Sequence, residues 1–336
     1  MKKVLVLGGT GAMGQYLVPK LIQMRYKVDV VAFDQPVSNH PNLRYIQSNN
    51  AKEIFYQAEL LKEDYDGIVD FLIYNTEEFR QRYEQFLTHT DHYIYLSSYR
   101  IYADSIDSPI TETSPRLLDV SEDKEFLASE DYSLYKARGE DILEQSEFNN
   151  WTIIRPAITF SNLRFQLVTL EAPVTVYRAL NNKAVVLPEE AMDVECTMSW
   201  AGDVAEMIAR LLLNPQAKRE RYTVATAEHQ PWETVFEYYQ KLIGMKRVLT
   251  DTETYVRLLI PRVENYLGCK WQLIYDRLFQ RRIDNSKILN ITGMKQSELM
   301  SLYDGLKLEL SHLPKILPWK GEDHINLNMD QFLNKQ

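Results

Sequence analysis

The segment that most constrains this fold is residues 3–14, KVLVLGGTGAMG. The continuous apolar run at 4–7 is typical of a short strand buried on both faces, and apolar residues recur at helical spacing after the glycines. The order is therefore strand, tight turn, helix. The glycines of the turn satisfy two related spacings, G-x-G-x-x-G at 9–14 and G-x-x-G-x-x-G at 8–14.

This glycine turn predicts a dinucleotide-binding loop. In such a loop one glycine permits the tight turn, one lets the backbone approach a pyrophosphate, and one lets the helix pack on the strand. The helix N-terminus then presents unpaired N–H groups and a positive dipole end to the phosphates. The alternative is a plain strand-helix turn, because glycine turns are common. The expected cofactor-binding residues of the loop are Gly8, Gly9, Thr10, Gly11, Ala12, Met13 and Gly14.

The composition is that of an ordinary globular protein and narrows the range of partners. The chain has 336 residues, 45% hydrophobic and 25% charged, enough for one large or two smaller domains. Its formal net charge of −9 disfavours nucleic-acid binding. Cys196 and Cys269 are far apart and predict two reduced thiols, with no metal site. The N-terminal apolar run is too short for a signal peptide, and no run approaches the roughly 18 apolar residues of a membrane span, so we expect a cytoplasmic protein without a membrane partner.

Strands and helices alternate along the first half of the chain. This alternation predicts a parallel, doubly wound sheet, in which ligands lie beyond the carboxyl ends of the strands. Ser97 and Ser98 directly follow one expected strand, and Thr76 is the expected N-cap of one helix. Residues 103–131 are acidic and rich in Ser and Pro, which predicts a surface excursion. Further strands are expected at 27–33, 43–47, 67–73, 93–96 and 151–155, and helices at 15–24, 52–61, 76–87 and about 131–147.

The second half is less regular. We expect short strands at 185–187 and 221–225, a helix at 204–213 with Asp203 as its N-cap, and mostly helix from Trp232 onward, broken by Gly268, Gly293 and Pro314. The expected architecture is a Rossmann-like doubly wound parallel sheet with a smaller, mainly helical C-terminal substrate domain. The sheet domain would span 1–160 and be rejoined by about 196–226, the substrate-binding part would comprise 161–195 and 227–320, and 321–336 would be a peripheral tail.

Asp34 is a candidate for binding the adenosine ribose of NAD. It stands 20 residues beyond Gly14 (34 − 14), near the end of the second expected strand, where an acid can bind the ribose hydroxyls. The same position is compatible with a solvated turn residue, because the strand can end at 32 or 33. No arginine follows immediately to bind a 2′-phosphate, which favours NAD and leaves NADP open.

Tyr132 and Lys136 are four residues apart and so lie on one face of the expected helix at 131–147. A free tyrosine has a pKa of about 10 and is a poor base at neutral pH. A lysine ammonium one helical turn away favours the phenolate, and so does the positive nicotinamide ring, which lowers that pKa. The pair therefore indicates a tyrosine activated as a general base.

The glycine turn, the segment 97–102 and Tyr132-x-x-x-Lys136 with Glu140 behind it resemble the short-chain dehydrogenase/reductase superfamily, in its extended branch of NAD-dependent epimerases and dehydratases. The matches span roughly residues 3 to 310. Weaker matches follow in the family's order at 109–115, at Arg155-Pro156, at 202–205 and at 284–287 before 292–293.

The resemblance implies a catalytic set. Tyr132 would take the proton of a substrate hydroxyl while a hydride passes to NAD, and Ser98 would hydrogen-bond the same oxygen. Lys136 would lower the pKa of Tyr132 and hold the nicotinamide ribose. Ser97 is taken as a packing or hydrogen-bonding neighbour, and Tyr135 as a competing surface tyrosine without a lysine four residues on. The implied function is an NAD(P)-dependent epimerase or oxidoreductase acting on a small molecule, a nucleotide sugar, in a homodimer.

The chain departs from the family pattern where substrate and adenine bind. Sugar-nucleotide dehydratases carry acidic residues directly after the catalytic hydroxyl, whereas this chain has Tyr99 and Arg100, which disfavours dehydration. At the third strand end, where the family often has Asp near the adenine, the chain has Ser48 and Asn49, and Asn49 is the candidate there. The substrate therefore cannot be carried over from the family. The alternative function is a non-catalytic NAD(P)-binding regulatory or RNA-associated protein of the same fold.

Overall fold

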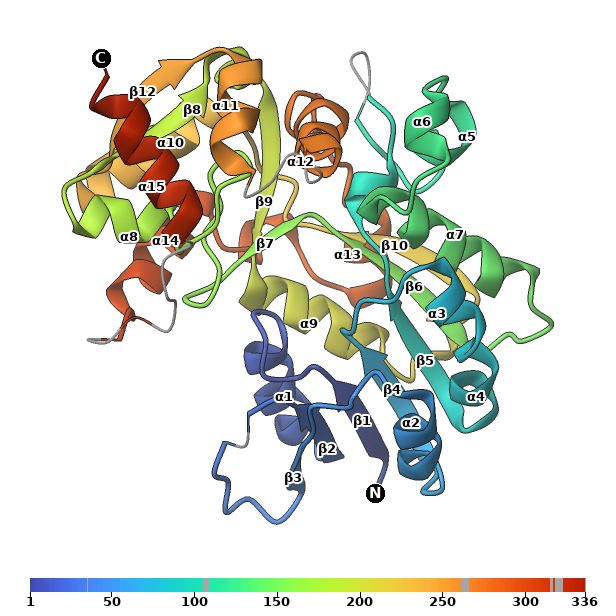
Figure 1. Ribbon diagram of the computed structural model, residues 1–336. Coiled ribbons are helices and arrows are strands. Elements are labelled where there is room, and N and C mark those ends of the chain that lie inside the picture. The colour runs from blue at the N-terminus through green and yellow to red at the C-terminus, as the bar shows by residue number, and fades with distance from the viewer. Residues whose placement is uncertain (35, 105–108, 261–265, 315–316, 318–322, 336) are drawn as a thin grey trace.

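A seven-stranded parallel sheet forms the first part of the molecule (Figure 1). The structure, a computed structural model, describes residues 1–34, 36–104, 109–260, 266–314, 317 and 323–335. The strand order β10-β6-β5-β4-β1-β2-β3 confirms the predicted doubly wound, Rossmann-like α/β fold. The strands are β1 (Lys3–Leu7), β2 (Lys27–Ala32), β3 (Leu43–Gln47), β4 (Tyr65–Asp70), β5 (Thr90–Leu96), β6 (Trp151–Pro156) and β10 (Glu220–Val224).

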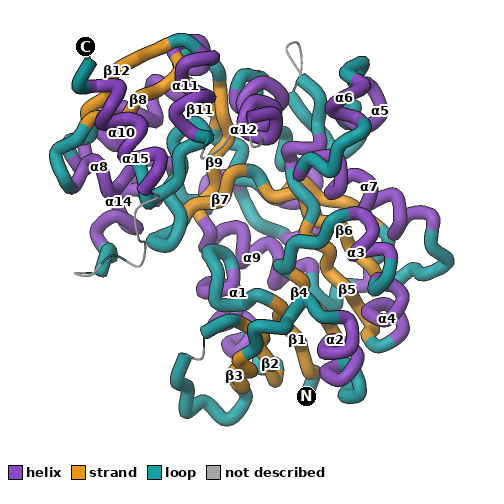
Figure 2. Tube along the Cα trace, in the orientation of Figure 1, coloured by secondary structure: helices purple, strands orange, loops and turns teal. Residues whose placement is uncertain are grey.

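Helices cover both faces of this sheet (Figure 2). Because β1 lies in the middle of the sheet and is covered on both faces, all but its first residue are buried. One face packs against α1 (Gly14–Gln23), α9 (Ala201–Leu211) and α13 (Ser286–Thr292). The other face packs against α2 (Ile54–Leu60), α3 (Thr76–Arg80), α4 (Tyr83–Thr88) and α7 (Tyr132–Gln145).

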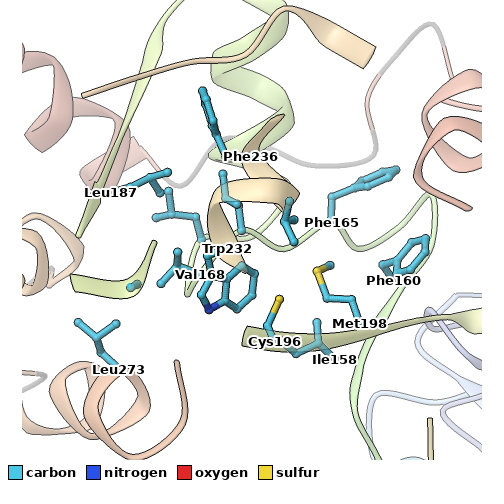
Figure 3. Close-up of a cluster of buried hydrophobic side chains, with 14 of the residues drawn as sticks. Ile158, Phe160, Phe165, Val168, Leu187, Cys196, Met198, Trp232, Phe236 and Leu273 are labelled. Carbon is cyan, nitrogen blue, oxygen red and sulfur yellow. The ribbon is translucent and has the colours of Figure 1, made fainter. Parts of the chain in front are cut away.

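The second part of the molecule is mainly helical with two small sheets. Its apolar side chains form one core in which Trp232 lies among Val168, Cys196 and Leu273 (Figure 3). The helices are α8 (Thr175–Leu180), α10 (Trp232–Ile243), α11 (Thr252–Leu259), α12 (Tyr266–Gln272), the π-helix η5 (Leu273–Arg277), α14 (Leu302–Ser311) and α15 (Asp323–Leu333). The sheets are β11 (His229–Pro231), β9 (Glu195–Trp200) and β7 (Ile158–Phe160), and β12 (Lys246–Thr250) paired with β8 (Ala184–Pro188).

Strands β7, β9, β11 and β12 were not predicted. In β9 the apolar residues Cys196, Met198 and Trp200 alternate with polar ones, a strand signal that the sequence does contain. Strand β12 follows Gly244, which ends α10 in the left-handed conformation at φ +68°. The prediction of mostly helix from Trp232 onward was therefore wrong at β12, where the chain returns to pair with β8.

Two predicted helix starts were wrong. The helix at 76–87 is two helices, α3 and α4, and its N-cap is Asn75, whose side chain accepts a hydrogen bond from the Glu78 amide. The helix breaks at the buried Arg82, which donates to the Lys52 carbonyl at 3.0 Å. Asp203 lies inside the first turn of α9, and its carboxylate accepts a hydrogen bond from the Met300 amide at 2.7 Å.

The described part of the predicted peripheral tail, 323–335, belongs to the core of the second part. Helix α15 packs against α11, and its Met329 is fully buried, because Ile325 and Met329 are four residues apart and share one helix face. Gly268 lies within α12 and does not interrupt it. In the described ranges, no helix combines the length and apolarity that crossing a membrane requires.

Candidate active site

A cavity of about 470 Å³ lies beyond the carboxyl ends of the parallel strands. It joins three segments that are far apart in the sequence: the glycine loop, the segment after β5 and the start of α7. The second part of the chain supplies the opposite wall. The wall comprises Gly8, Gly11–Gly14, Phe71, Ile73, Leu96–Arg100, Tyr132, Pro156–Thr159, Arg164, Gln166, Glu171, Gln272 and Arg277.

The glycine loop has the geometry that its spacing predicts. Gly8 has φ +74°, a conformation that favours glycine, and a Cβ on Gly14 would lie 2.3 Å from the Gly9 carbonyl oxygen. A Cβ on Gly11 would meet only the Gly8 oxygen, at 3.5 Å. No side chain of the described residues caps the N-terminus of α1, which lies on the cavity wall. The loop therefore offers backbone N–H groups to an anion.

Asp34 lies beside this loop, because its carboxylate accepts a hydrogen bond from the Thr10 hydroxyl at 2.6 Å. Asn49 is exposed in the turn after β3 and is not brought to the cavity wall. Among the described residues, the cavity wall also does not include Gly9, Thr10 or Asp34. The structure thus groups Asp34 with the glycine loop, and Asn49 remains apart from the cavity.

Both serines that follow β5 reach the cavity wall. Ser98 is the N-cap of the short helix η1 (Tyr99–Ile101), and its Oγ accepts a hydrogen bond from the Arg100 amide at 3.2 Å. This contact leaves the Ser98 hydroxyl proton available for a ligand oxygen. The buried Ser97 Oγ has no hydrogen-bond partner among the described residues, which the sequence prediction of a packing or hydrogen-bonding neighbour did not anticipate.

Tyr132 lies on the cavity wall and Lys136 lies behind it. The Lys136 Nζ is 5.8 Å from the centroid of the Tyr132 ring and donates a hydrogen bond to the Leu96 carbonyl at 2.6 Å. Burial lowers the pKa of Lys136 to about 8, although the nearby Asp70 and Glu140 carboxylates favour its charged form. The contact with Leu96 uses one of the three N–H donors of the Lys136 ammonium.

Tyr135, which is partly buried, and Asp70, which is buried, are the neighbours of this pair. The Tyr135 ring is 6.0 Å from the Lys136 Nζ, and burial raises the pKa of Tyr135 above its usual value, so this tyrosine stays protonated. Asp70 ends β4, is fully buried and accepts a hydrogen bond from Tyr93 at 2.9 Å. Burial raises the pKa of Asp70 to about 6.

A buried ion pair holds α7 in place. Arg155 of β6 donates two hydrogen bonds to the Glu140 carboxylate, at 2.8 and 2.6 Å, and both side chains are fully buried. The same guanidinium donates to the Tyr102 hydroxyl at 2.7 Å and to the Glu112 carbonyl at 3.0 Å. Several positions of the family resemblance therefore meet in one network that positions the helix of Tyr132. The segment 103–131, expected on the surface, contributes the buried Glu112 to it.

Arginines of the cavity wall are the site residues that sequence reasoning missed. The Arg100 guanidinium carbon lies 5.0 Å from the Tyr132 ring centroid. Arg277 reaches the cavity from η5, and Arg164 reaches it from the loop after β7 and contacts Glu171 at 3.2 Å. Arg100 stood in a predicted segment, but no local pattern marks Arg164 or Arg277.

Comparisons with known proteins show which solved structures share this fold. No protein-family model matches the chain, and no curated protein is significantly similar to it in sequence. Pal from Bacillus thuringiensis is 16% identical with a TM-score of 0.70, over 92% of this chain and 98% of that one. The Bordetella bronchiseptica enzyme WbmH, solved with NAD+, is 14% identical with a TM-score of 0.67, over 93% and 98% of the two chains. UDP-glucose 4-epimerase of Thermotoga maritima, solved with UDP-glucose, is 15% identical with a TM-score of 0.67, over 92% and 98%.

At these identities the similarity shows a shared fold over almost the whole length of each chain. The fold is the one that the resemblance to extended short-chain dehydrogenases/reductases predicts, including the second part that faces the sheet across the cavity.

Proposed function

We propose that this chain is an NAD-dependent enzyme of the extended short-chain dehydrogenase/reductase type that transfers a hydride at a secondary alcohol of a nucleotide sugar. The observation that carries the proposal is the single cavity whose wall contains the glycine loop, Ser98 and Tyr132. The structures of WbmH with NAD+ and of the epimerase with UDP-glucose support this cofactor and this substrate class. The product would be an epimer if the cofactor stays bound, and an oxidised or reduced sugar if it exchanges.

The residues of the first part fit NAD. The pyrophosphate is assigned to the N–H groups of the loop at 8–14 and of the uncapped N-terminus of α1, where an added Cβ at Gly11 would meet only the Gly8 oxygen, at 3.5 Å. Asp34, held by Thr10, is assigned to the adenosine ribose, and Asn49 to the neighbourhood of the adenine. When bound, NAD supplies the hydride acceptor and donor of the reaction.

Three side chains are assigned to the chemistry. Tyr132 takes the proton of the substrate hydroxyl. The carbon that bears this hydroxyl loses its hydride to NAD, so that a carbonyl forms. Ser98 donates its free hydroxyl proton in a hydrogen bond to the same oxygen, which gains negative charge as it loses its own proton. The Lys136 ammonium, 5.8 Å from the centroid of the Tyr132 ring, stabilises the phenolate, and the burial of Lys136 strengthens this effect because water screens it less.

The opposite wall is assigned to the rest of the substrate. Arg164, Gln166 and Glu171 come from 161–195, and Gln272 and Arg277 come from 227–320, the two stretches proposed as the substrate-binding part. The sheet domain is proposed as 1–160 with the return of 196–226. A homodimer belongs to the same proposal, and light scattering of the purified protein tests it.

The deciding experiment identifies the nucleotide that the purified protein releases on denaturation, by mass spectrometry. Stoichiometric NAD or NADH supports the proposal and favours an epimerase, whereas NADP or NADPH overturns the assignment of Asp34. If the protein is empty, calorimetric titration with each cofactor follows, and failure of both to bind overturns the proposal. A panel of UDP-sugars is then added, absorbance at 340 nm reports net oxidation or reduction, and NMR of the recovered sugars reports epimerisation. Cofactor binding without turnover of any sugar would favour the non-catalytic alternative.

A further inference from the structure

One buried carboxylate in the second part of the molecule is shared by three guanidiniums. Asp276 contacts the Nη1 of Arg277 with its Oδ2, and its Oδ1 lies 3.1 Å from the Nε of Arg281. The Nε of Arg100 lies 3.4 Å from the same Oδ2. Although burial alone would raise the pKa of Asp276, the guanidiniums hold it below its usual value. Three positive charges thus meet at this one carboxylate, and a second carboxylate, that of Asp131, lies near only one of them, Arg100.

Backbone carbonyls satisfy two of the three arginines. Arg281 donates to the carbonyls of Tyr102, Ala103 and Tyr275 at 3.0 to 3.1 Å, and Arg277 donates to the Val168 carbonyl at 2.7 Å. The third arginine, Arg100, is different. Its Nε is buried and makes no hydrogen bond within the described residues. A second carboxylate, that of Asp131, lies 3.9 Å from its Nη2.

The unbalanced charge faces the cavity. Arg100 and Arg277 both lie on the wall, and both approach one oxygen of Asp276, so their guanidiniums are neighbours. Arg164 is also on the wall, but it is 42% exposed and contacts Glu171. The described wall thus has three arginines and one acidic residue in a chain of net charge −9. Because buried charges without counter-charges are costly, this end of the cavity is built for an anion.

We propose that Arg100 and Arg277 form a subsite for an oxyanion group of the substrate, a carboxylate or a phosphate, next to the reacting alcohol. A guanidinium presents parallel N–H groups that match either oxyanion, and the guanidiniums of Arg100 and Arg277, which both line the cavity, supply such donors. Arg100 stacks 5.0 Å from the Tyr132 ring, so an oxyanion held there lies close to the proposed base. The position of the reacting alcohol rests on the proposed function; the binding of the anion does not.

The test measures anion binding by isothermal titration calorimetry, with malonate and inorganic phosphate as probes at constant ionic strength. Each titration is run with and without NAD, because phosphate also has a site in the glycine loop. The wild-type protein binds at least one probe in the presence of NAD, and Arg100→Gln weakens that binding by about tenfold or more. Arg100→Lys keeps the charge and retains part of the affinity. Tighter binding of malonate indicates that the substrate group is a carboxylate. Tighter binding of phosphate indicates that it is a phosphate.

Arg247→Gln is the matched control, since Arg247 is 21% exposed, pairs with Glu233 and lies outside the cavity wall. It leaves anion binding unchanged. Equal binding by wild type and Arg100→Gln, or no binding of either probe to the wild type, overturns the subsite. Circular dichroism confirms that each variant is folded. Failure of NAD to bind, with anion binding that still depends on Arg100, would instead overturn the proposed function alone.

Discussion

The two walls of the cavity are built in different ways. The wall of the first part combines backbone, in the glycine turn and the uncapped start of α1, with the side chains of Ser98, Arg100 and Tyr132. The wall of the second part consists of side chains from loops and from η5, held by a buried ionic cluster. A binding loop made of backbone suits a ligand that is the same in different proteins of one fold. Side chains change readily by substitution, so they suit a ligand that differs from one protein to the next.

The buried charged groups of the two parts also differ, in how far their charges are balanced within the protein. Arg155 and Glu140 form a buried pair with two hydrogen bonds outside the cavity wall. Arg116, which pairs with Asp119 and Asp141, lies 3.7 Å from Glu140. Asp276 faces three guanidiniums, two of which line the cavity. The charges around Glu140 are compensated within the protein and position a helix, whereas the cluster at the cavity has more guanidiniums than carboxylates.

Tyr132→Phe tests the chemistry of the first wall and has the largest expected effect. Without the phenolic oxygen no group at this position takes the substrate proton, so the rate of hydride transfer falls by about 10²- to 10⁴-fold. The measurement is the single-turnover absorbance change at 340 nm with the sugar that the wild-type protein oxidises. Tyr135→Phe is the control, because the Tyr135 ring is as close to Lys136 but lies off the cavity wall, and its rate stays within about twofold. Similar losses in both variants would contradict the assignment of the base.

Gly14→Ala tests whether the backbone of the first wall holds the cofactor. The new Cβ would lie 2.3 Å from the Gly9 oxygen, so α1 and the loop must separate. We expect NAD affinity to fall at least tenfold, with a loss of about 1–3 kcal/mol in the free energy of unfolding from overpacking. Gly268→Ala is the control in the second part, where a Cβ has nothing within 4 Å, and it leaves NAD binding unchanged. Full NAD affinity in Gly14→Ala would remove the loop from the cofactor site.

Asp70→Asn tests the electrostatics behind the first wall. Above pH 6 the Asp70 carboxylate is ionised and favours the protonated form of Lys136, whose pKa is about 8. Removing that negative charge lowers the pKa of Lys136 further, so the ammonium is lost at a lower pH. The alkaline limb of the pH–rate profile therefore moves to lower pH, which measurements between pH 6 and 9 reveal. An unmoved limb would mean that Lys136 does not control the activity of the base.

Asp203→Asn has the smallest expected effect and concerns stability where the two parts meet. Burial raises the pKa of Asp203 to about 6, above the roughly 3.9 of an unfolded Asp, so the native state binds the extra proton and loses stability as pH rises from about 4 to 6. The amide keeps an acceptor for the Met300 amide without the charge. Urea unfolding at pH 7 to 8 is expected to show a gain of about 1–2 kcal/mol, which disappears below pH 4. A gain that persists at pH 4, or a shifted pH–rate profile, would contradict this account.

Local patterns predicted the first wall well. The alternation of strands and helices fixes the parallel sheet, and the ends of its strands bring Ser98 and Tyr132 to the glycine loop. The second wall has no such pattern. The contacts of Asp276 join residues near 100 and near 280, and nothing in the sequence around either segment specifies the partner. Strand β12 was missed for the same reason, since it is stabilised by its distant neighbour β8.

The packing of α15 into the core of the second part has a consequence for folding during synthesis. All seven strands of the large sheet have left the ribosome once β10 has emerged. The second part still lacks Met329, which fills its core, and Asp330, which pairs with the fully buried Arg178. The strands can thus pair while translation continues, but α13, which covers one face of the sheet, and the opposite side of the cavity are completed only after the residues that follow β10 have been made.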